Sequence, residues 1–216
     1  MVDLVEGSSQ PVQVWRDCYD QVLAPSFPAD ELVGEQDFVA ARERPTSRVL
    51  FALDAGAPVG LSMVDSAAVD APVALLSYLA THPTRRARGV GSMLMQQVRA
   101  HEPMLLIEIE DPREHGERGF GDPWRRVEFY RRHGVRALQV PYFQPPVAPG
   151  HPRVDGMLLG LLTPGPVPDT VDAGPVRDYL VDYLRSSGED LEQPPASTLL
   201  AALTGSMVRV VDLPAA

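Results

Sequence analysis

The sequence predicts an α/β fold of the α+β kind, in which helices flank a mixed and mostly antiparallel sheet. Three short valine-rich segments, over 49–53, 59–64 and 73–80, follow one another across turns, and such a series predicts an antiparallel meander. A helix over 93–100 and a strand over 104–109 come next. The order strand, helix, strand implies a parallel crossover, so we expect both kinds of strand pairing in one sheet.

Two helices are expected to open the fold. Apolar residues recur at helical spacing between Trp15 and Leu23, and Ser26-Phe27-Pro28 ends that pattern. A second short helix is expected over 31–41. Cys18 is the one cysteine of the chain and cannot form an internal disulfide, so we assign it to packing and expect a reducing compartment.

The strand and helix pattern continues beyond the crossover. Helical periodicity predicts a helix over 124–133, and Gly134 is placed to close it. Two more strands are expected over 137–142 and 157–162.

A change of composition separates the last part of the chain. Prolines and glycine interrupt the periodic pattern over 164–168. We therefore expect a domain over residues 1–163 and a mainly helical extension over 164–216 that packs on it. Within the extension an amphipathic helix is expected over 176–184, followed by a second short helix and, over 207–211, by a strand.

Composition and charge exclude several classes of protein. The chain has 216 residues, a formal net charge of −10 and 19 basic residues that are all arginine, so nucleic acid is not an expected partner. No segment reaches the ~18 to 20 apolar residues of a membrane span, and the N-terminal residues lack signal-peptide features. We expect a cytoplasmic protein without a membrane partner; a homodimer is left open. Eleven of the arginines fall between Arg85 and Arg136.

A turn rich in arginine and glycine joins the third valine-rich segment to the following helix. Gly89 and Gly91 let the backbone approach a ligand closely, and the unpaired N–H groups of the helix that begins there point into the turn. Positive charge at the same place comes from Arg85, Arg86 and Arg88. Several donors and an arginine acting together predict a site for phosphate groups.

Two other kinds of site fit the residues less well. A dinucleotide-binding turn would need a third glycine where Leu94 stands, and a tight connection to its strand where Pro83 and its neighbours intervene. The five histidines are scattered and there is no Gly-x-Ser-x-Gly elbow. Neither a metal site nor a serine hydrolase is therefore expected.

Three segments resemble one known family. Arg-Ala-Arg-Gly-Val-Gly at 86–91 matches the Arg/Gln-x-x-Gly-x-Gly/Ala signature of the GCN5-related N-acetyltransferases, the GNAT superfamily. Leu-Ala-Thr-His-Pro at 79–83 resembles the strand end that precedes this signature, and Phe-Tyr-Arg-Arg-His-Gly-Val at 129–135 resembles the later Phe-Tyr-x-x-x-Gly-Phe segment. The motifs stand in the family's order, and the similarity in element order covers residues 1–163.

The resemblance implies a GNAT-like sheet in which two splayed strands form a slot for acyl-CoA, with acetyl-CoA as cosubstrate. The backbone of Leu79 and Thr81 would pair with the pantetheine arm. Amides of the turn would hold the pyrophosphate, and they belong to Arg86, Ala87, Arg88, Gly89, Val90, Gly91 and Ser92. The implied reaction moves an acetyl group to an amine of a small molecule or peptide by direct attack.

The resemblance also assigns candidate catalytic residues. Tyr130 matches the tyrosine that commonly protonates the leaving thiolate, and its ordinary pKa of about 10 keeps tyrosine a proton donor at neutral pH. The amine must lose a proton to a carboxylate or a water relay. Glu108 is our candidate base; it shares one strand face with Glu110, an alternation that also fits a solvated sheet edge.

The acceptor pocket is expected around the helix break and the later strands. Phe27 and Glu31 lie where relatives form one wall of this pocket, and Glu110 and Tyr142 are candidates for the remaining walls. The loop over 111–122 is rich in glycine and is expected to contribute to the choice of acceptor.

Two alternatives to an N-acetyltransferase stay open. One is a non-catalytic, regulatory acyl-CoA-binding module, and the other is a transferase that uses a hydroxyl acceptor or a longer acyl donor on the same scaffold. One position also departs from the family, because Pro123 stands where many relatives place an asparagine near the cofactor. Every residue of the turn is expected to bind the acyl donor, so the sequence leaves the acceptor unidentified.

Overall fold

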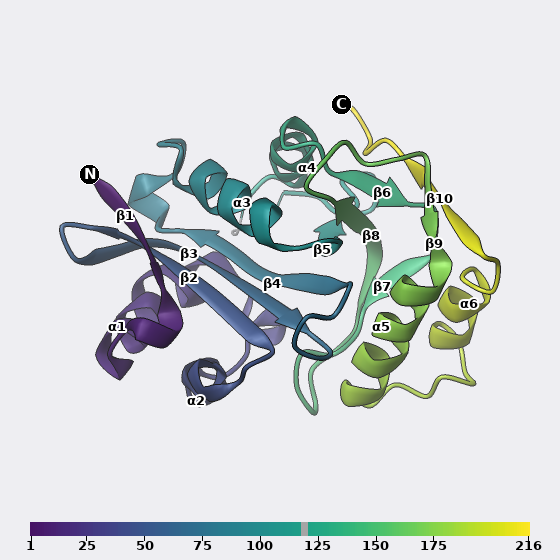
Figure 1. The fold of residues 1–216 in the computed structure, drawn as a ribbon, viewed down its shortest axis with the longest axis horizontal. Coiled ribbons are helices and arrows are strands. Elements are labelled where there is room, and N and C mark those ends of the chain that lie inside the picture. Colours follow the sequence, from purple (N-terminus) through teal and green to yellow (C-terminus); the bar gives the residue numbers. More distant parts are fainter. Residues whose placement is uncertain (118–120) are drawn as a thin grey trace.

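The computed structural model describes residues 1–117 and 121–216. Its strands are β1 (Val2–Glu6), β2 (Ser47–Asp54), β3 (Ala57–Ser66), β4 (Ala74–Thr81), β5 (Leu105–Glu110), β6 (Arg136–Leu138), β7 (Tyr142–Gln144), β8 (Val154–Leu162), β9 (Thr170–Asp172) and β10 (Met207–Val211). Within the described residues they form one sheet in the order β1-β2-β3-β4-β5-β8-β6-β10-β9, and β7 also pairs with β8 (Figure 1).

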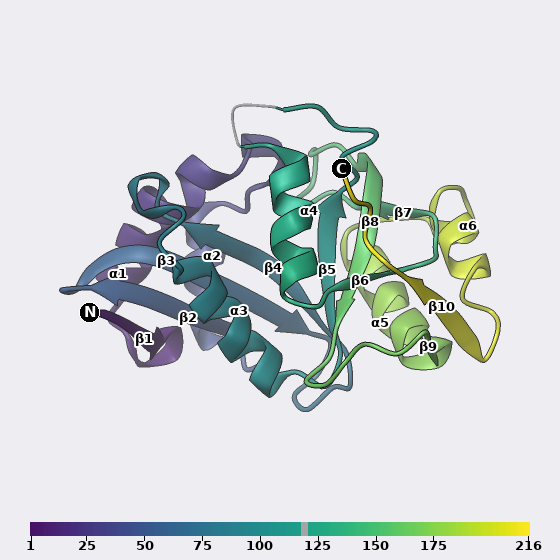
Figure 2. The same ribbon diagram turned by 90° about the horizontal axis from the view of Figure 1, so that it is seen from above.

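Helices cover both faces of this sheet (Figures 1 and 2). They are α1 (Val12–Cys18), α2 (Glu35–Ala40), α3 (Val90–His101), α4 (Pro123–Arg132), α5 (Ala173–Ser186) and α6 (Ala196–Ala201). Buried side chains of α3 and α4 share one hydrophobic cluster with β4 and β5. On the other face, α1 and α2 pack on β2, β3 and β4, whereas α5 and α6 pack on β5, β8 and β10.

The predicted sheet is confirmed in its main features. β2, β3 and β4 pair antiparallel as a meander, and β4 pairs with β5 in parallel across α3. The expected helices before and after β5 correspond to α3 and α4, and Gly134 closes α4 with a positive φ of 83°. None of the helices in the described part of the chain has both the length and the apolar composition that crossing a bilayer requires.

Three sequence-based expectations need correction. The fold opens with β1, which pairs with β2, and not with a helix. The strand expected over 137–142 is two short strands, β6 and β7, with Pro141 between them; proline cannot donate to a sheet ladder. The short strand β9 was not expected at all, because its three residues are too few to give a pattern.

Cys18 is fully buried in the hydrophobic cluster that α1 and α2 form with β2, β3 and β4, which confirms its assignment to packing. The ring of Trp15 lies 5.1 Å from the rings of both Phe38 and Phe51, and its Nε1 donates to the carbonyl oxygen of Gly7 at 2.9 Å. Aromatic side chains contribute most to core energetics, and a buried indole N–H needs such a partner. This cluster fixes α1 and α2 against the meander.

The segment after residue 164 contributes to the sheet as well as to the helices. β10 pairs with both β6 and β9, and the buried Val176, Leu180 and Leu184 of α5 lie in one cluster with Leu106 and Leu159 of the central strands. Burying a leucine or valine side chain contributes about 1.5 to 3 kcal/mol. The extension is therefore held by the same core that holds the central sheet.

Candidate active site

The strands β4 and β5 separate halfway along their length. Their parallel pairing covers Ala74 to Leu76 of β4, and no further pair follows, although β4 continues to Thr81. Separation begins at a bulge, since Met63 of β3 pairs with Tyr78 and Val64 pairs with Leu76, so that the intervening Ser77 has no partner. A bulge bends its strand and increases the local twist. The two strands thus open a slot between them.

This slot is a cavity of about 490 Å³. Its described lining includes Leu79, Thr81, Arg86 and Gly91 on the side of the turn, and Phe129 and Tyr130 on α4. The predicted cofactor residues are therefore only partly gathered, because Ala87, Arg88, Gly89, Val90 and Ser92 do not line the cavity. They belong to the turn and to the first residues of α3 beside it.

The N-terminus of α3 is open toward the turn. Gly89 precedes the helix with a φ of 83°, a conformation that glycine adopts without penalty. No side chain of the described residues caps the first turn, so the amides there lack helical partners. A Cβ on Gly91 would lie 3.5 Å from the ring of Phe129, which places the backbone of this residue directly against the slot.

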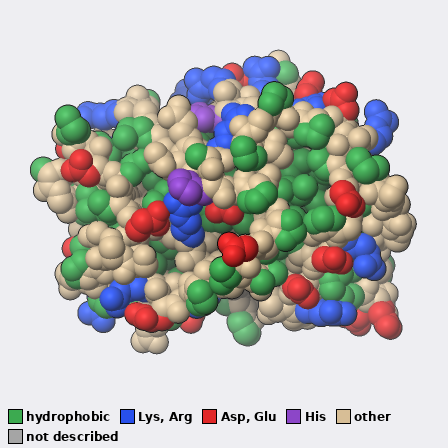
Figure 3. All heavy atoms as spheres, in the orientation of Figure 1, with side chains coloured by type: hydrophobic (Ala, Val, Ile, Leu, Met, Phe, Trp, Pro, Cys, Tyr) green, Lys and Arg blue, Asp and Glu red, His purple; other side chains and the backbone are tan. Residues whose placement is uncertain are grey.

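Several arginines near the turn in the sequence bind other parts of the fold and do not line the slot. Arg85 pairs with Asp54 at 3.1 Å, and Arg99 donates to the carbonyl oxygens of Thr163 and Gly165, both at 2.9 Å. Basic side chains also gather along the edge of the molecule that α4 occupies (Figure 3). The concentration of arginines in the sequence therefore overstates the charge at the turn, where Arg86 lines the slot.

Tyr130 has the environment of a proton donor. It is 8% exposed, it lines the slot, and burial raises the pKa of its phenol. Its hydroxyl makes no hydrogen bond with the part of the chain that the structure describes. A protonated, unengaged hydroxyl in the slot can give its proton to a group bound there.

The carboxyl group of Glu108 has a raised pKa. Burial raises its pKa to about 7, and hydrogen bonds from Tyr142 and Tyr183 oppose that rise. Tyr142 Oη donates to Oε1 at 2.6 Å, and Tyr183 Oη donates to the same oxygen at 3.3 Å. β5 pairs with β8 along its whole length as well as with β4, so the interpretation of Glu108 on a solvated sheet edge is wrong. A carboxyl group with a pKa near neutrality suits general base chemistry.

Glu110 has a different environment two residues further along β5. It lines the slot but forms an ion pair with Arg126 of α4. The contacts of Glu108 are neutral hydroxyls, whereas Glu110 faces a guanidinium. The environment of Glu108 favours gaining and losing a proton near pH 7, and Glu110 is held in an ion pair across the slot.

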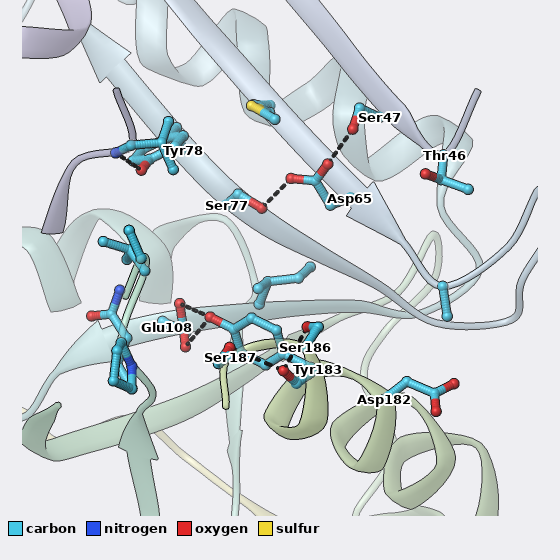
Figure 4. Close-up of a pocket in the computed structure, with 18 of the residues that line it drawn as sticks. Thr46, Ser47, Asp65, Ser77, Tyr78, Glu108, Asp182, Tyr183, Ser186 and Ser187 are labelled. Atoms are coloured by element: carbon cyan, nitrogen blue, oxygen red, sulfur yellow. Dashed lines mark hydrogen bonds between the residues drawn. The ribbon is translucent and has the colours of Figure 1, made fainter. Parts of the chain in front are cut away.

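A second and larger cavity, of about 770 Å³, lies against α5, and we call it the α5 cavity. Side chains from β2, β3 and β4 form one side and α5 forms the other (Figure 4). It shares five lining residues with the slot: Glu31, Ser77, Tyr78, Glu108 and Gln144. Glu108 therefore lines both cavities, at the place where β4 and β5 open.

The α5 cavity contains an oriented carboxylate, Asp65. Ser47 and Ser77 each donate a hydroxyl hydrogen bond to it, the second at 2.6 Å, and both point toward it in Figure 4. Asp65 is partly buried, and it pairs with no cationic side chain in the described part of the chain. Charges removed from water are normally paired. This carboxylate is therefore suited to bind a positively charged group.

The predicted acceptor residues are only partly brought together. Phe27 and Glu31 line the slot, and the ring of Phe27 packs at 5.0 Å on that of Tyr78. Tyr142 lines neither cavity and lies behind Glu108, to which it donates. Of the loop over 111–122, residues 118–120 lie outside the described part of the chain.

Sequence reasoning missed two of the polar residues near Glu108. Tyr183 belongs to the amphipathic helix that was expected, and it follows Tyr179 at the helical spacing of four residues, but this pattern indicates only a buried face. Asp65 comes directly after the valine-rich segment 59–64, at a predicted turn, and no motif there indicates a binding residue. Within the described residues, no group of three or more histidine, cysteine, aspartate or glutamate side chains is arranged to hold a metal ion.

A central segment of the chain matches a known protein family. Residues 45–136 match the family described as the acetyltransferase (GNAT) domain. This range contains the meander, the turn, α3, β5 and α4. No curated protein sequence matches the chain significantly.

Solved structures resemble the fold over most of the chain. A GNAT-family protein from Bacteroides thetaiotaomicron has a TM-score of 0.64 at 21% identity, covering 86% of this chain and 96% of that one. The ribosomal-protein-S18-alanine N-acetyltransferase from Escherichia coli has a TM-score of 0.53 at 12% identity, covering 78% and 97%. An aminoglycoside 6'-N-acetyltransferase in complex with coenzyme A has a TM-score of 0.52 at 16% identity, covering 78% and 99%.

Proposed function

We propose that this chain, whose residues 45–136 match the acetyltransferase (GNAT) domain family, transfers an acetyl group from acetyl-CoA to an amine by direct attack. One observation carries this proposal. Glu108, with a pKa of about 7, is shared by two cavities that meet at the opened strands. A donor in one cavity and an acceptor in the other would meet beside a base.

The donor belongs in the slot between β4 and β5. The unpaired backbone of Leu79 and Thr81 is available to the pantetheine arm on the side of β4 that faces away from β3. The amides at the start of α3, together with Arg86, are suited to the pyrophosphate, since helix N-termini and guanidinium groups both favour anions.

The chemistry needs three proton transfers. An ammonium group gives a proton to Glu108, and the neutral nitrogen attacks the thioester carbon, forming a tetrahedral intermediate. The bond between carbon and sulfur then breaks, Tyr130 gives its proton to the departing thiolate, and the second proton of the nitrogen restores the Tyr130 hydroxyl as the amide forms. Burial supports both roles, because it raises the pKa of Glu108 to about 7 and keeps Tyr130 protonated.

The acceptor belongs in the α5 cavity and carries positive charge. Four carboxylates line this cavity, and among its described lining residues Arg44 is the one cation; the carboxylates are Glu31, Asp65, Glu108 and Asp182. A site lined by one sign of charge concentrates ligands of the opposite sign. A small-molecule amine or a peptide N-terminus with a further cationic group fits this lining.

Incubation of the purified protein with acetyl-CoA and a panel of amines tests the proposal. Free thiol should appear with at least one cationic amine, and the product should gain the mass of one acetyl group. Alcohols and longer acyl-CoA donors in the same panel test the two alternative transferases. Tight binding of CoA without turnover on any acceptor, and with no effect of Tyr130→Phe, would instead establish a binding module.

A further inference from the structure

We propose that Tyr183 of α5 is a positioning residue for Glu108, so that the C-terminal extension completes the base of the acetyl transfer. This inference rests on the proposed function. Glu108 lies on β5, in the middle of the sheet, and Tyr183 lies 75 residues further along the chain. Tyr183 reaches from α5 toward the carboxylate of Glu108 (Figure 4).

The two carboxylate oxygens of Glu108 differ in the hydrogen bonds that they accept. Oε1 accepts from Tyr142 at 2.6 Å and from Tyr183 at 3.3 Å. Oε2 has the longer contact of 3.5 Å with Tyr183 and no other hydrogen bond among residues 1–117 and 121–216. A carboxylate offers about four acceptor sites, so Oε2 keeps lone pairs for the proton of an amine. Two hydroxyls on one side hold the carboxylate in a single orientation.

The neighbouring packing fixes the position of α5. Its N-terminus is capped by Asp172, whose carboxylate accepts from the amide of Gly174 at 2.9 Å. Just beyond its C-terminus, Glu189 forms a two-point ion pair with Arg153, the residue that precedes β8. Bidentate pairs of this kind restrict geometry as well as contributing energy. Tyr183 is therefore presented to Glu108 from a helix held at both ends.

Both phenols remain donors at any pH where the reaction could run. Burial raises the pKa of Tyr142 and of Tyr183 well above the ordinary value. Other titratable groups that act electrostatically with Glu108 come from the N-terminal segment, β4 and α5, and they are Glu31, Tyr78 and Tyr179. Glu31 opposes the ionisation of Glu108, whereas the Tyr142 and Tyr183 hydrogen bonds favour it.

Removing the Tyr183 hydroxyl should therefore move the pH profile. Tyr183→Phe retains the ring and its packing but removes one hydrogen bond that stabilises the ionised form of Glu108. The acidic limb of kcat/KM for the amine should shift upward by about one pH unit. At a pH below that limb, kcat/KM of Tyr183→Phe should be about tenfold lower than that of the wild type at the same pH. The KM for acetyl-CoA should stay unchanged.

Tyr179→Phe is the matched control, because the Tyr179 hydroxyl, one helical turn away, donates to the carbonyl oxygen of Asp65 at 3.3 Å and is not among the groups that shift the pKa of Glu108. Its acidic limb should stay where the wild-type limb lies. A role of Tyr183 in packing alone would leave the limb unmoved in both variants, and that result would overturn the inference.

A titration that does not depend on turnover separates this inference from the proposed function. The carboxyl carbon of Glu108 can be followed by ¹³C NMR, with its signal assigned from its loss in Glu108→Gln. The midpoint should be higher in Tyr183→Phe than in the wild type or in Tyr179→Phe. An unchanged midpoint refutes the role of Tyr183. A shifted midpoint, in a protein that acetylates no amine, supports the hydrogen bond and refutes the proposed function.

Discussion

The slot and the α5 cavity are built in opposite ways. Backbone amides and Arg86 supply the polar groups of the slot near the turn, and they come from one continuous stretch of chain that runs from β4 into α3. The polar groups of the α5 cavity are side chains from β2, β3, β4, β5 and α5. Phosphate can be bound by any backbone with free amides, whereas an acceptor must be distinguished by side chains.

Their charges differ as well. The slot has positive groups at its turn end, where the N-terminus of α3 and Arg86 lie. Its whole described lining is mixed, with Arg86, Arg125 and Arg126 beside five acidic side chains, Glu31, Glu108, Glu110, Glu117 and Asp122, and Arg126 is paired with Glu110. The α5 cavity has Arg44 against four carboxylates. A substitution in one half should therefore change one substrate and leave the other unaffected, and each of the following experiments tests that separation.

The largest effect is expected from Glu108→Gln. The amide oxygen can still accept from Tyr142 and Tyr183, so the geometry is retained, but the base is lost and turnover should fall about 10³-fold. In the wild type the base acts only when ionised, so kcat/KM should fall as the pH drops through about 7. CoA affinity, measured by calorimetry, should not change. Turnover that survives in Glu108→Gln would point to a water relay that bypasses this residue.

Tyr130→Phe should lower kcat about 10²-fold, because the thiolate would leave without a proton donor. The side chain is buried and keeps its packing in the variant. Steady-state kinetics with varied acetyl-CoA should show an unchanged KM. A reduction confined to KM would instead mean that the hydroxyl binds the donor.

Gly91→Asp should weaken CoA binding about 100-fold, because it places a negative charge and a side chain where the pyrophosphate would lie. The new Cβ meets Phe129 at ordinary contact distance, so the fold should be retained, as circular dichroism can verify. Gly91→Ala is the steric control and should have a smaller effect. Gly89→Asp tests the same turn, but Gly89 has a φ of 83°, so there a side chain adds backbone strain. CoA affinity unchanged in folded Gly91→Asp would remove the turn from the donor site.

The smallest effect is expected from Asp65→Asn. Ser47 and Ser77 can still donate to the amide oxygen, but the charge is lost, so the KM of a diamine should rise about tenfold. The KM of a monoamine of equal length should change less. Asp70→Asn makes the same chemical change on an exposed turn and serves as the control. Equal effects on both amines would show that Asp65 recognises no second cationic group.

Local patterns predicted the elements that depend on local interactions. The meander, the crossover and α3 followed from periodicity, since the alternation of apolar residues is fixed by the geometry of each element. β1 and β9 were missed because they are short strands whose stability comes from their partners, β2 and β10. The break between β6 and β7 was also missed, although Pro141 lies in it and proline cannot donate to a sheet ladder.

The turn of the proposed donor site was predictable to a similar degree, and the proposed acceptor site was not. The motif at 86–91 is contiguous, so its residues are neighbours in the structure whatever the rest of the chain does. Tyr183 and Asp65 are joined to Glu108 and Ser77 only through pairing across the sheet and the packing of α5. No local spacing encodes those contacts.

By itself the sequence predicted a mixed sheet, a turn suited to phosphate groups and a pair of proton-transfer candidates, because each depends on short segments of the chain. The tertiary structure decided which carboxylate is suited to be the base. Burial between β4 and β8 raises the pKa of Glu108 to about 7, against the hydrogen bonds of two distant hydroxyls that favour its ionised form. Glu110, two residues away, forms an ion pair with Arg126. Desolvation and partners, which set a pKa, exist only once the chain has folded.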